Sequence, residues 1–117
     1  MYARTTLFEV DTERTSIDAA FKRFTETVLP RLREQPGCLG VIVMQTPEGK
    51  GMLVSFWQSS EAAAATLESG FYDAQVRELL MFLRQPPGRE QYEVTCYELS
   101  DAIVTGRTVF PGQDAQA

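Results

Sequence analysis

At 117 residues, with 44% hydrophobic and 23% charged residues, the chain has the length and composition of one globular domain with a single core. Its net charge of −5 argues against a nucleic-acid-binding protein, which normally shows a basic face, and no stretch approaches the roughly 18 apolar residues of a membrane span. The first residues lack the apolar stretch of a signal peptide, so we expect a cytoplasmic protein with neither a nucleic-acid nor a membrane partner.

The chain contains no histidine, which removes the commonest general base, the commonest metal ligand and the usual axial ligand of haem. Nucleophilic sites that pair serine or cysteine with histidine are therefore excluded. Cys38 and Cys96 fall in predicted strands without a C-x-x-C spacing, and we expect both to be buried free thiols. No cluster of Asp and Glu stands out, so the sequence predicts no metal and no cofactor.

The N-terminal half begins with a predicted strand at residues 2–10, which are rich in β-forming side chains. Ser16 is a suitable N-cap for a helix whose apolar residues recur every three or four positions: Ile17, Phe21, Phe24, Val28 and Leu32. Pro30 should kink this helix or split off its last turn. Residues 38–45 and 52–58 then predict a hairpin with a longer loop.

The C-terminal half contains a second helical region and a fourth strand. Ser59 or Ser60 can cap the helical region, and Gly70 should divide it into two pieces. The fourth strand is predicted at residues 91–99. The element order is therefore β-α-β-β-α-β, which predicts an α+β, ferredoxin-like fold with an antiparallel sheet.

Residues 1–99 make up this predicted domain, and residues 100–117 form a tail. Within the tail, Ala102-Ile103-Val104 can add a short strand. We expect the end of the chain from Gln113 to be mobile.

Two predicted strands are apolar on both faces, at Val41-Ile42-Val43 and at Met52-Leu53-Val54. A sheet with helices on one face and water on the other should alternate instead. The second face therefore needs a partner, and we predict a homodimer in which the sheet of a second copy covers it through a two-fold interface. The alternative is that the helices and the tail cover more of the sheet than expected.

Two short segments carry a resemblance to a known family. One is Pro36-Gly37-Cys38-Leu39-Gly40, a P-G-x-x-G pattern, and the other is Val54-Ser55-Phe56-Trp57-Gln58-Ser59-Ser60-Glu61-Ala62, in which a strand runs through W-x-S-x-E into a capped helix. They resemble the antibiotic biosynthesis monooxygenase superfamily over about residues 2–99. The resemblance implies a dimeric α+β barrel with a substrate cavity between sheet and helices in each protomer. It also implies cofactor-independent oxidation of aromatic polyketides, haem degradation, or the metabolism of small quinols or autoinducers.

The haem-degrading branch of that family does not fit this sequence. It resembles the chain through Trp57, but it expects a second Trp and then a haem-ligating His where this sequence has Thr66 and Val76. Because the chain has no histidine at all, we expect no haem degradation.

The polyketide-oxidising branch needs no metal or flavin, because a deprotonated electron-rich phenol or anthrone can itself pass an electron to O2. The resemblance implies two catalytic residues: Trp57, stacking on the substrate ring, and Arg77, stabilising its oxyanion. Polar partners found in that branch are replaced here by Leu53 and Ala63. The alternatives are that Trp57 is a packing anchor and that Arg77 is solvated or ion-paired.

Four further residues are candidates for substrate binding. Arg4 is costly to bury on the first strand unless it is paired or used, and Thr6 shares its face. Tyr72 and Tyr92 either donate a phenol hydrogen bond to the substrate or pack with a wet tip. The leading hypothesis is a cofactor-independent monooxygenase that oxidises a small aromatic, phenolic or quinol-type molecule with O2. A non-catalytic ligand-binding dimer and a polyketide isomerase or cyclase on the same fold are the alternatives.

Overall fold

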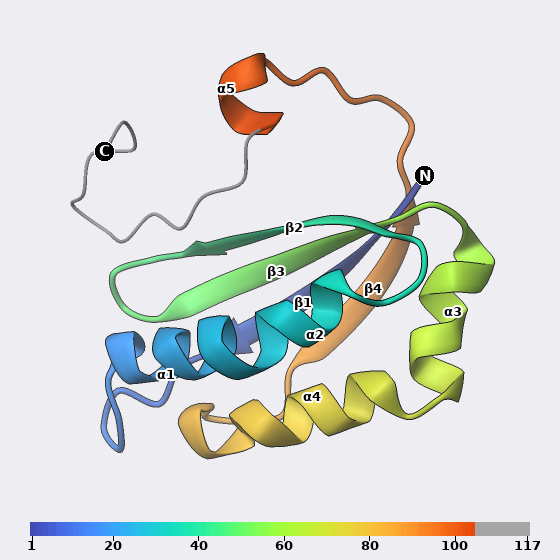
Figure 1. Ribbon diagram of the computed structural model, residues 1–117. Coiled ribbons are helices and arrows are strands. Elements are labelled where there is room, and N and C mark those ends of the chain that lie inside the picture. Colours follow the sequence, from blue (N-terminus) through green and yellow to red (C-terminus); the bar gives the residue numbers. More distant parts are fainter. Residues whose placement is uncertain (105–117) are drawn as a thin grey trace.

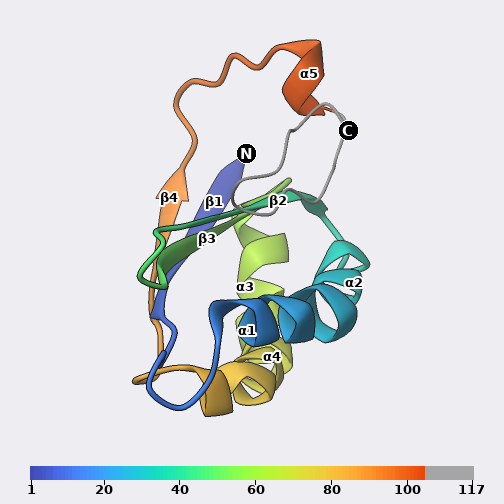
Figure 2. The same ribbon diagram turned by 90° about the vertical axis from the view of Figure 1, so that its left-hand side faces the viewer.

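The computed structural model of the protein describes residues 1–104. Four antiparallel strands form one sheet in the order β2-β3-β1-β4, with bounds β1 Tyr2–Glu9, β2 Cys38–Gln45, β3 Lys50–Trp57 and β4 Gly88–Glu93. Helices cover one face of this sheet (Figures 1 and 2). The order and pairing of the strands confirm the predicted ferredoxin-like α+β fold. None of the described helices is long and apolar enough to cross a membrane.

The first helical segment consists of three consecutive parts: α1 Ile17–Arg23, the π-helical η1 Phe24–Val28 and α2 Leu29–Arg33. Pro30 explains this division, since it has no N–H to continue the α-helical pattern. The turn before it widens, and the N–H of Leu29 bonds to the carbonyl of Phe24, five residues back. The helix is thus divided near Pro30, as predicted, and the dividing element is a π-helical turn whose Phe24 and Val28 are buried.

The second helical segment begins at Ser59, whose hydroxyl accepts a hydrogen bond from the N–H of Ala62 at 3.1 Å. Its parts are α3 Ser60–Glu68, α4 Phe71–Leu79 and the 3-10 turn η2 Leu80–Phe82. Gly70 separates α3 from α4 with φ of 81°, a conformation that glycine adopts at little cost. The predicted break at Gly70 is confirmed, and it turns α4 to run alongside the first helical segment (Figure 1).

The fourth strand is shorter and lies earlier than the predicted residues 91–99. β4 ends at Glu93 because its neighbour β1 begins at Tyr2, and these two residues pair. One more backbone hydrogen bond, from the N–H of Val94 to the carbonyl of Met1 at 2.9 Å, closes the pairing. Within the described chain, the residues that follow have no neighbouring strand, so the β-forming side chains there do not extend the sheet.

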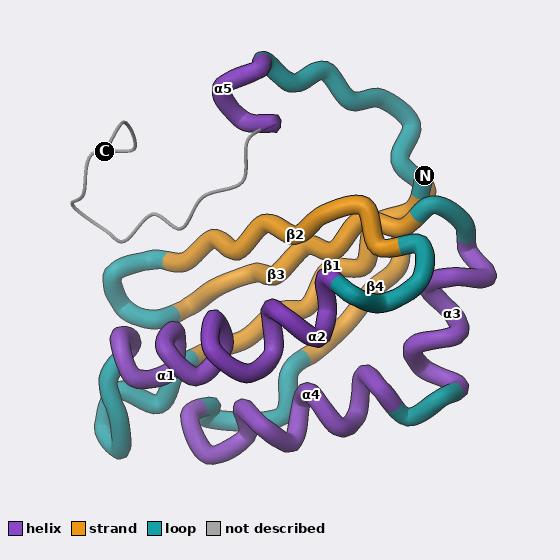
Figure 3. The backbone as a smooth tube through the Cα atoms, in the orientation of Figure 1, coloured by secondary structure: helices purple, strands orange, loops and turns teal. Residues whose placement is uncertain are grey.

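Residues 94–100 lead away from the sheet to a short helix, α5 Asp101–Val104, on the opposite side of the sheet from α1–α4 (Figures 1, 2 and 3). The predicted strand at residues 102–104 is therefore wrong, because this part of the chain does not reach a sheet edge. Tyr97 and Leu99 are 68% and 53% exposed on this arm. The end from Gln113, which we expect to be mobile, lies outside the described residues.

The two cysteines differ from their predicted environment. Cys38 lies in β2 as predicted but is only half-buried, while Cys96 is exposed and lies beyond β4. Both are free thiols. The prediction of a buried strand residue is therefore wrong for Cys96, for the same reason that β4 ends early.

The two faces of the sheet both carry apolar side chains, as the sequence pattern predicts. Strand alternation points Val43 and Leu53 toward the helices, where they line a cavity, and it points their neighbours Ile42 and Met44 away. On the face opposite α1–α4, Leu7, Ile42 and Met44 are 54%, 39% and 50% exposed. In the single protomer these large apolar side chains are therefore in contact with solvent.

Candidate functional site

A partly open cavity of about 110 Å³ lies between the helix-covered face of the sheet and the first and second helical segments. One water needs roughly 10–15 Å³ of such a cavity, so there is room for several waters or a small organic molecule. Among the lining residues Arg4 alone is charged, and none is Asp, Glu or Lys. The described residues also form no group of three or more Cys, Asp or Glu side chains that could hold a metal ion.

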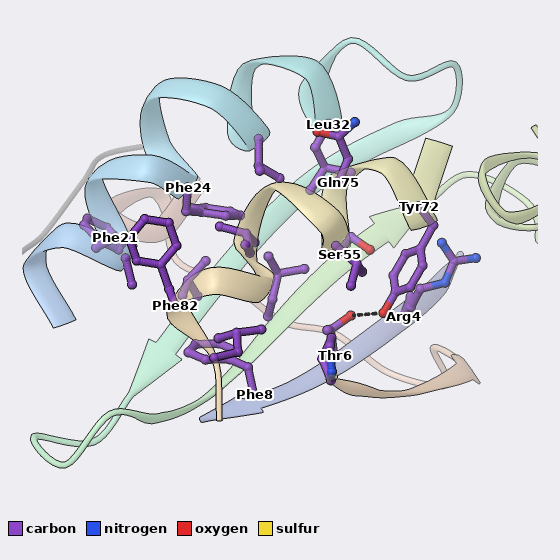
Figure 4. A pocket seen from close by; sticks show the side chains of 18 of the residues that line it. Arg4, Thr6, Phe8, Phe21, Phe24, Leu32, Ser55, Tyr72, Gln75 and Phe82 are labelled. Carbon is purple, nitrogen blue, oxygen red and sulfur yellow. Dashed lines mark hydrogen bonds between the residues drawn. The ribbon is translucent and has the colours of Figure 1, made fainter. Parts of the chain in front are cut away.

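The lining side chains fall into two groups (Figure 4). We name as the polar end the residues Arg4, Thr6, Ser55, Tyr72 and Gln75. We name as the aromatic end the residues Phe8, Phe21, Phe24 and Phe82. Phenylalanine rings favour edge-to-face or offset contacts with another ring. The arrangement suits a flat apolar molecule that carries its polar groups at one end.

Arg4 is the central residue of the polar end and is only 3% exposed. Its Nη1 donates a hydrogen bond to the hydroxyl of Thr66 at 2.6 Å, and its Nη2 donates one to the carbonyl of Ala63 at 2.6 Å. The guanidinium Cζ lies 5.9 Å from the ring centroid of Trp57 and 5.5 Å from that of Tyr72. These contacts fix its position, yet no carboxylate of the described chain forms an ion pair with it.

The charge of Arg4 persists in this setting. Burial lowers the pKa of the Arg4 guanidinium, the nearby Tyr72 phenol acts to raise it, and the positive charge of Arg89 lowers it further. Arginine starts from so high a pKa that it stays protonated at neutral pH. A buried cation without a counter-ion is costly, so an anionic ligand at this point would offset a penalty already present in the fold.

Thr6 and Tyr72 approach each other from opposite walls, β1 and α4, with their hydroxyl oxygens 3.4 Å apart. Two cations lie near the Tyr72 ring: the Cζ of Arg89 is 5.0 Å from its centroid and the Cζ of Arg4 is 5.5 Å from it. The structure therefore brings together three of the residues predicted from the sequence, namely Arg4, Thr6 and Tyr72.

Trp57 is fully buried, with 0% of its surface exposed, and it belongs to a core cluster with Leu32 and Ala63. Its indole N–H donates a hydrogen bond to the hydroxyl of Ser55 at 2.9 Å. Because the ring has no exposed surface, this conformation offers no face for a substrate to stack on. The geometry supports the alternative role of a packing anchor, through which Trp57 positions Arg4 and Ser55.

Arg77 and Tyr92 lie outside the cavity. Arg77 is exposed on α4, while its neighbours Gln75 and Val76 line the cavity. Tyr92 is 54% exposed on β4 and pairs with Ala3, whose side chain points away from the helices. Neither residue lies beside Arg4, Thr6 and Tyr72 in the cavity, so neither belongs to the candidate site.

Sequence reasoning missed four polar residues that line the cavity: Gln45, Ser55, Thr66 and Gln75. Two of them follow from spacing, because Ser55 shares its strand face with Trp57, and Gln75 lies one helical turn after Tyr72. Gln75 is notable because its side-chain oxygen Oε1 is buried without a hydrogen-bond partner in the described chain. No local pattern indicates that Thr66 accepts a hydrogen bond from Arg4, 62 residues earlier.

Comparison with known proteins shows which family the chain resembles. A family model described as antibiotic biosynthesis monooxygenase matches residues 1–78. A comparison with curated proteins gives no match.

Several solved structures share the fold. A monooxygenase from Streptomyces coelicolor, ActVA-Orf6, in complex with nanaomycin D, is 21% identical with a TM-score of 0.65, over 86% of this chain and 92% of that one. A variant of SnoaB, a cofactor-independent oxygenase from Streptomyces nogalater, is 11% identical with a TM-score of 0.67, over 82% and 94%. Rv0793 from Mycobacterium tuberculosis is 16% identical with a TM-score of 0.63, over 85% and 98%. Together with the matched family model, which spans most of the chain, these likenesses lead to one conclusion: the chain belongs to the antibiotic biosynthesis monooxygenase family.

Proposed function

We propose that the protein is a cofactor-independent monooxygenase that oxidises a small aromatic, phenolic or quinol-type molecule with O2. The observation that carries this proposal is Arg4, a buried cation without a carboxylate partner at the polar end of a cavity in which no other lining residue is charged. Membership of the family supports a monooxygenase-type function. The substrate class is further supported by the nanaomycin D complex of ActVA-Orf6 and by the description of SnoaB as a cofactor-independent oxygenase.

Arg4 would act by stabilising the ionised substrate. Two of its five N–H groups are engaged by Thr66 and Ala63, which leaves others to donate to a substrate oxygen. A charge-assisted hydrogen bond in a water-poor site is stronger than the same bond in water. An opposite charge within about 4–6 Å lowers the pKa of an acid by about 1–3 units. The cavity would therefore favour the phenolate, which is the form that reduces oxygen.

The oxidation itself needs only the substrate anion and O2. The anion passes one electron to O2, and the two radicals combine at carbon to give a peroxide. With an anthrone, loss of water from the peroxide turns the CH2 group into a carbonyl, so that one oxygen atom enters the product and the other leaves as water. With a hydroquinone, two electrons and two protons pass to O2 and the products are the quinone and hydrogen peroxide.

The lining residues include no carboxylate and no histidine, so the phenol proton would leave to water rather than to a side chain. Thr6 and Tyr72 supply hydroxyl groups beside Arg4 that can hydrogen-bond to the reacting oxygen. The aromatic end would hold the rest of the ring system and exclude water from the radical pair. Trp57 and Thr66 would act as positioning residues through their contacts with Arg4.

Oxygen consumption by the purified, metal-free protein, with a panel of anthrones and hydroquinones, tests the proposal. We expect uptake with quinone formation above the spontaneous rate. Arg4→Met should lower kcat/KM by about a hundredfold, the scale of losing one oxyanion-stabilising donor. Arg77→Met is the matched control and should leave the rate unchanged, because Arg77 is exposed outside the cavity.

The folding of Arg4→Met is checked by its thermal melt, and Arg4→Lys, which keeps the charge, should retain part of the activity. A full rate in a folded Arg4→Met would contradict the role of Arg4. If Arg77→Met alone lost activity, the residue that stabilises the oxyanion would be Arg77, as the family resemblance implies, and not Arg4.

The lack of any carboxylate, histidine or lysine among the lining residues supports a second candidate, a dimer that binds a small aromatic ligand without turning it over. Tight binding without oxygen uptake across the panel would favour that candidate. Product formation under anaerobic conditions would instead indicate an isomerase or cyclase of polyketides.

We also propose that two copies of the chain pair through the sheet face opposite α1–α4. Exposed Leu7, Ile42 and Met44 on that face, and Tyr97 and Leu99 on the arm beside it, supply apolar surface for such a contact. Burial of these side chains removes apolar area from water, which stabilises association.

A further inference from the structure

Arg89 is a second cation beside the polar end of the cavity. It lies on β4 opposite Thr6 of β1, and paired residues of neighbouring strands point to the same face, so its side chain is on the side of the helices. Its Cζ is 5.0 Å from the ring centroid of Tyr72, which lines the cavity, whereas Arg89 is not a lining residue itself. Arg89 therefore lies just outside the polar end.

The polar end reaches solvent beside Arg89. Arg89 and Gln91 point to the side of the helices and are nevertheless exposed, so no helix of the described chain covers them. Thr6 and Tyr72, which stand next to Arg4 at this end (Figure 4), are only half-buried. A ligand bound against Arg4 can therefore extend past Tyr72 to the solvent beside Arg89.

Neither Arg4 nor Arg89 has a counter-ion within residues 1–104. Glu93 points to the same side of β4 as Arg89, four residues further on, and forms no ion pair with it in that part of the chain. The positive charge of Arg89 is close enough to lower the pKa of the Arg4 guanidinium. Two like charges without counter-ions are unfavourable at one site, and anionic groups of a ligand would offset this.

The chemistry of the ligand decides whether Arg89 contributes to its binding. A phenol in free solution is neutral at neutral pH, so an exposed cation adds little to its recognition. A carboxylate is ionised under the same conditions, and its two oxygens match the donor pairs of a guanidinium. The two cations therefore suit an aromatic molecule whose phenolic oxygen lies at Arg4 and whose carboxylate extends to Arg89.

We propose that Arg89 is an anion-binding residue at the mouth of the cavity, which favours aromatic ligands that carry a carboxylate in addition to the oxygen at Arg4. This inference rests on the proposed function, because it requires the phenolic oxygen of the ligand to lie at Arg4. It adds to that function a binding position outside the cavity and on an element, β4, that supplies none of the lining residues.

Anaerobic calorimetric titrations test this inference without requiring turnover. The probes are a hydroxynaphthoate, with its hydroxyl and carboxylate on different rings, and the corresponding carboxamide, which has nearly the same size and no charge. The wild type should bind the carboxylate about fivefold more tightly than the amide, on the scale of an exposed ion pair. The preference should decrease at high salt, because Arg89 is exposed.

Variants of Arg89 assign the preference to this residue. Arg89→Gln should bind the two probes about equally, and Arg89→Lys, which keeps the charge, should keep part of the preference. Arg77→Gln is the matched control, because it removes an exposed arginine of α4 that lies outside the cavity, and it should keep the wild-type preference. Thermal melts check that each variant is folded.

The same preference in the wild type and in a folded Arg89→Gln would overturn the inference. Equal affinities for the two probes in the wild type, an equal loss of preference in Arg77→Gln, or no binding of either probe would do so too. If the preference follows Arg89 but no phenol causes oxygen uptake, the proposed oxidation fails while the site at Arg89 stands. If oxygen uptake depends on Arg4 but the preference does not depend on Arg89, only the inference fails.

Discussion

Arg4 owes its place in the cavity to contacts made by side chains far away in the sequence. Thr66→Val removes the hydroxyl that accepts a hydrogen bond from Nη1 at 2.6 Å and keeps the side-chain shape. We expect kcat/KM to fall by about tenfold, because Arg4 loses orientation, and the free energy of unfolding to fall by about 1–3 kcal/mol from the unpaired donor. Steady-state oxygen uptake and urea denaturation measure the two effects.

Thr5→Val is the control for that experiment, since Thr5 lies next to Arg4 on β1 and its side chain points away from the helices. It should leave kcat/KM within twofold of the wild type, on the scale of a surface substitution. Unchanged kinetics in Thr66→Val would show that Arg4 keeps its position without this hydrogen bond.

The candidate residues show which features of a site a sequence can reveal. Arg4 and Thr6 could be found, because alternation along a strand assigns them one shared face. The sequence spacing from Trp57 could not show which way Arg77 points. Gly70 breaks the helical region, and the break changes which residues of α4 face the sheet. The actual α4 residues of the polar end, Tyr72 and Gln75, follow only once the start of α4 is known.

At the scale of the elements, the features that depend on residues nearby in the sequence could be predicted from that sequence. The caps at Ser16 and Ser59, the division near Pro30 and the break at Gly70 depend on nearby residues, and all four occur where predicted. The end of β4 depends instead on where β1 begins, and the structure of the arm depends on which surface lies beside it. The local sequence pattern therefore predicts neither the end of β4 nor the structure of the arm.

Gly37 lies in the turn between α2 and β2, next to Ala62 of α3. A substitution there tests the role of the P-G-x-x-G segment. Its φ is 82°, and a Cβ added there would lie 2.6 Å from the Cβ of Ala62. We expect Gly37→Ala to lower the free energy of unfolding by about 1–3 kcal/mol through backbone strain and overlap. Gly40→Ala, in the same segment, has open space around the added Cβ and should be nearly neutral in the same urea titration.

Asp11 connects the end of β1 to the chain after η2, and its ionisation makes this connection sensitive to pH. The hydrogen bond from Arg14 lowers the pKa of the Asp11 carboxyl, and the charges of Arg14 and Arg84 lower it further. A carboxyl with a lowered folded-state pKa contributes stability above its unfolded pKa of about 3.9, and loses it as the pH falls through the folded pKa.

Asp11→Asn should therefore melt at a lower temperature than the wild type at pH 7, and the difference should shrink below about pH 4. Thermal melts across this pH range measure the effect, with Asp73→Asn on the exposed face of α4 as the control. A constant difference at all pH values would assign the effect to packing rather than to the charge of Asp11.

At the scale of the whole molecule, the uncovered face of the sheet predicts self-association. Ile42→Glu places a charge among the apolar side chains of that face, on the edge strand β2, and should raise the dimer dissociation constant at least about a hundredfold, because the carboxylate would be buried without a partner. Light scattering after size-exclusion chromatography measures the change.

Met81→Glu is the matched control, since Met81 is 62% exposed on η2, on the side of the helices. It should leave the oligomeric state unchanged. A wild type that is monomeric at micromolar concentration would contradict the proposed pairing. The cytoplasmic location and the absence of a cofactor stay predictions from the sequence.

The central claim is that the cavity binds an aromatic molecule as its anion against Arg4. The most direct test is an anaerobic spectrophotometric titration of a phenolic ligand, which gives the pKa of the ligand free and bound. We predict that binding to the wild type lowers that pKa by about 1–3 units, and that binding to Arg4→Met does not lower it, because the apolar walls then favour the neutral phenol. A ligand pKa that is unchanged or raised on binding to the wild type would contradict the account.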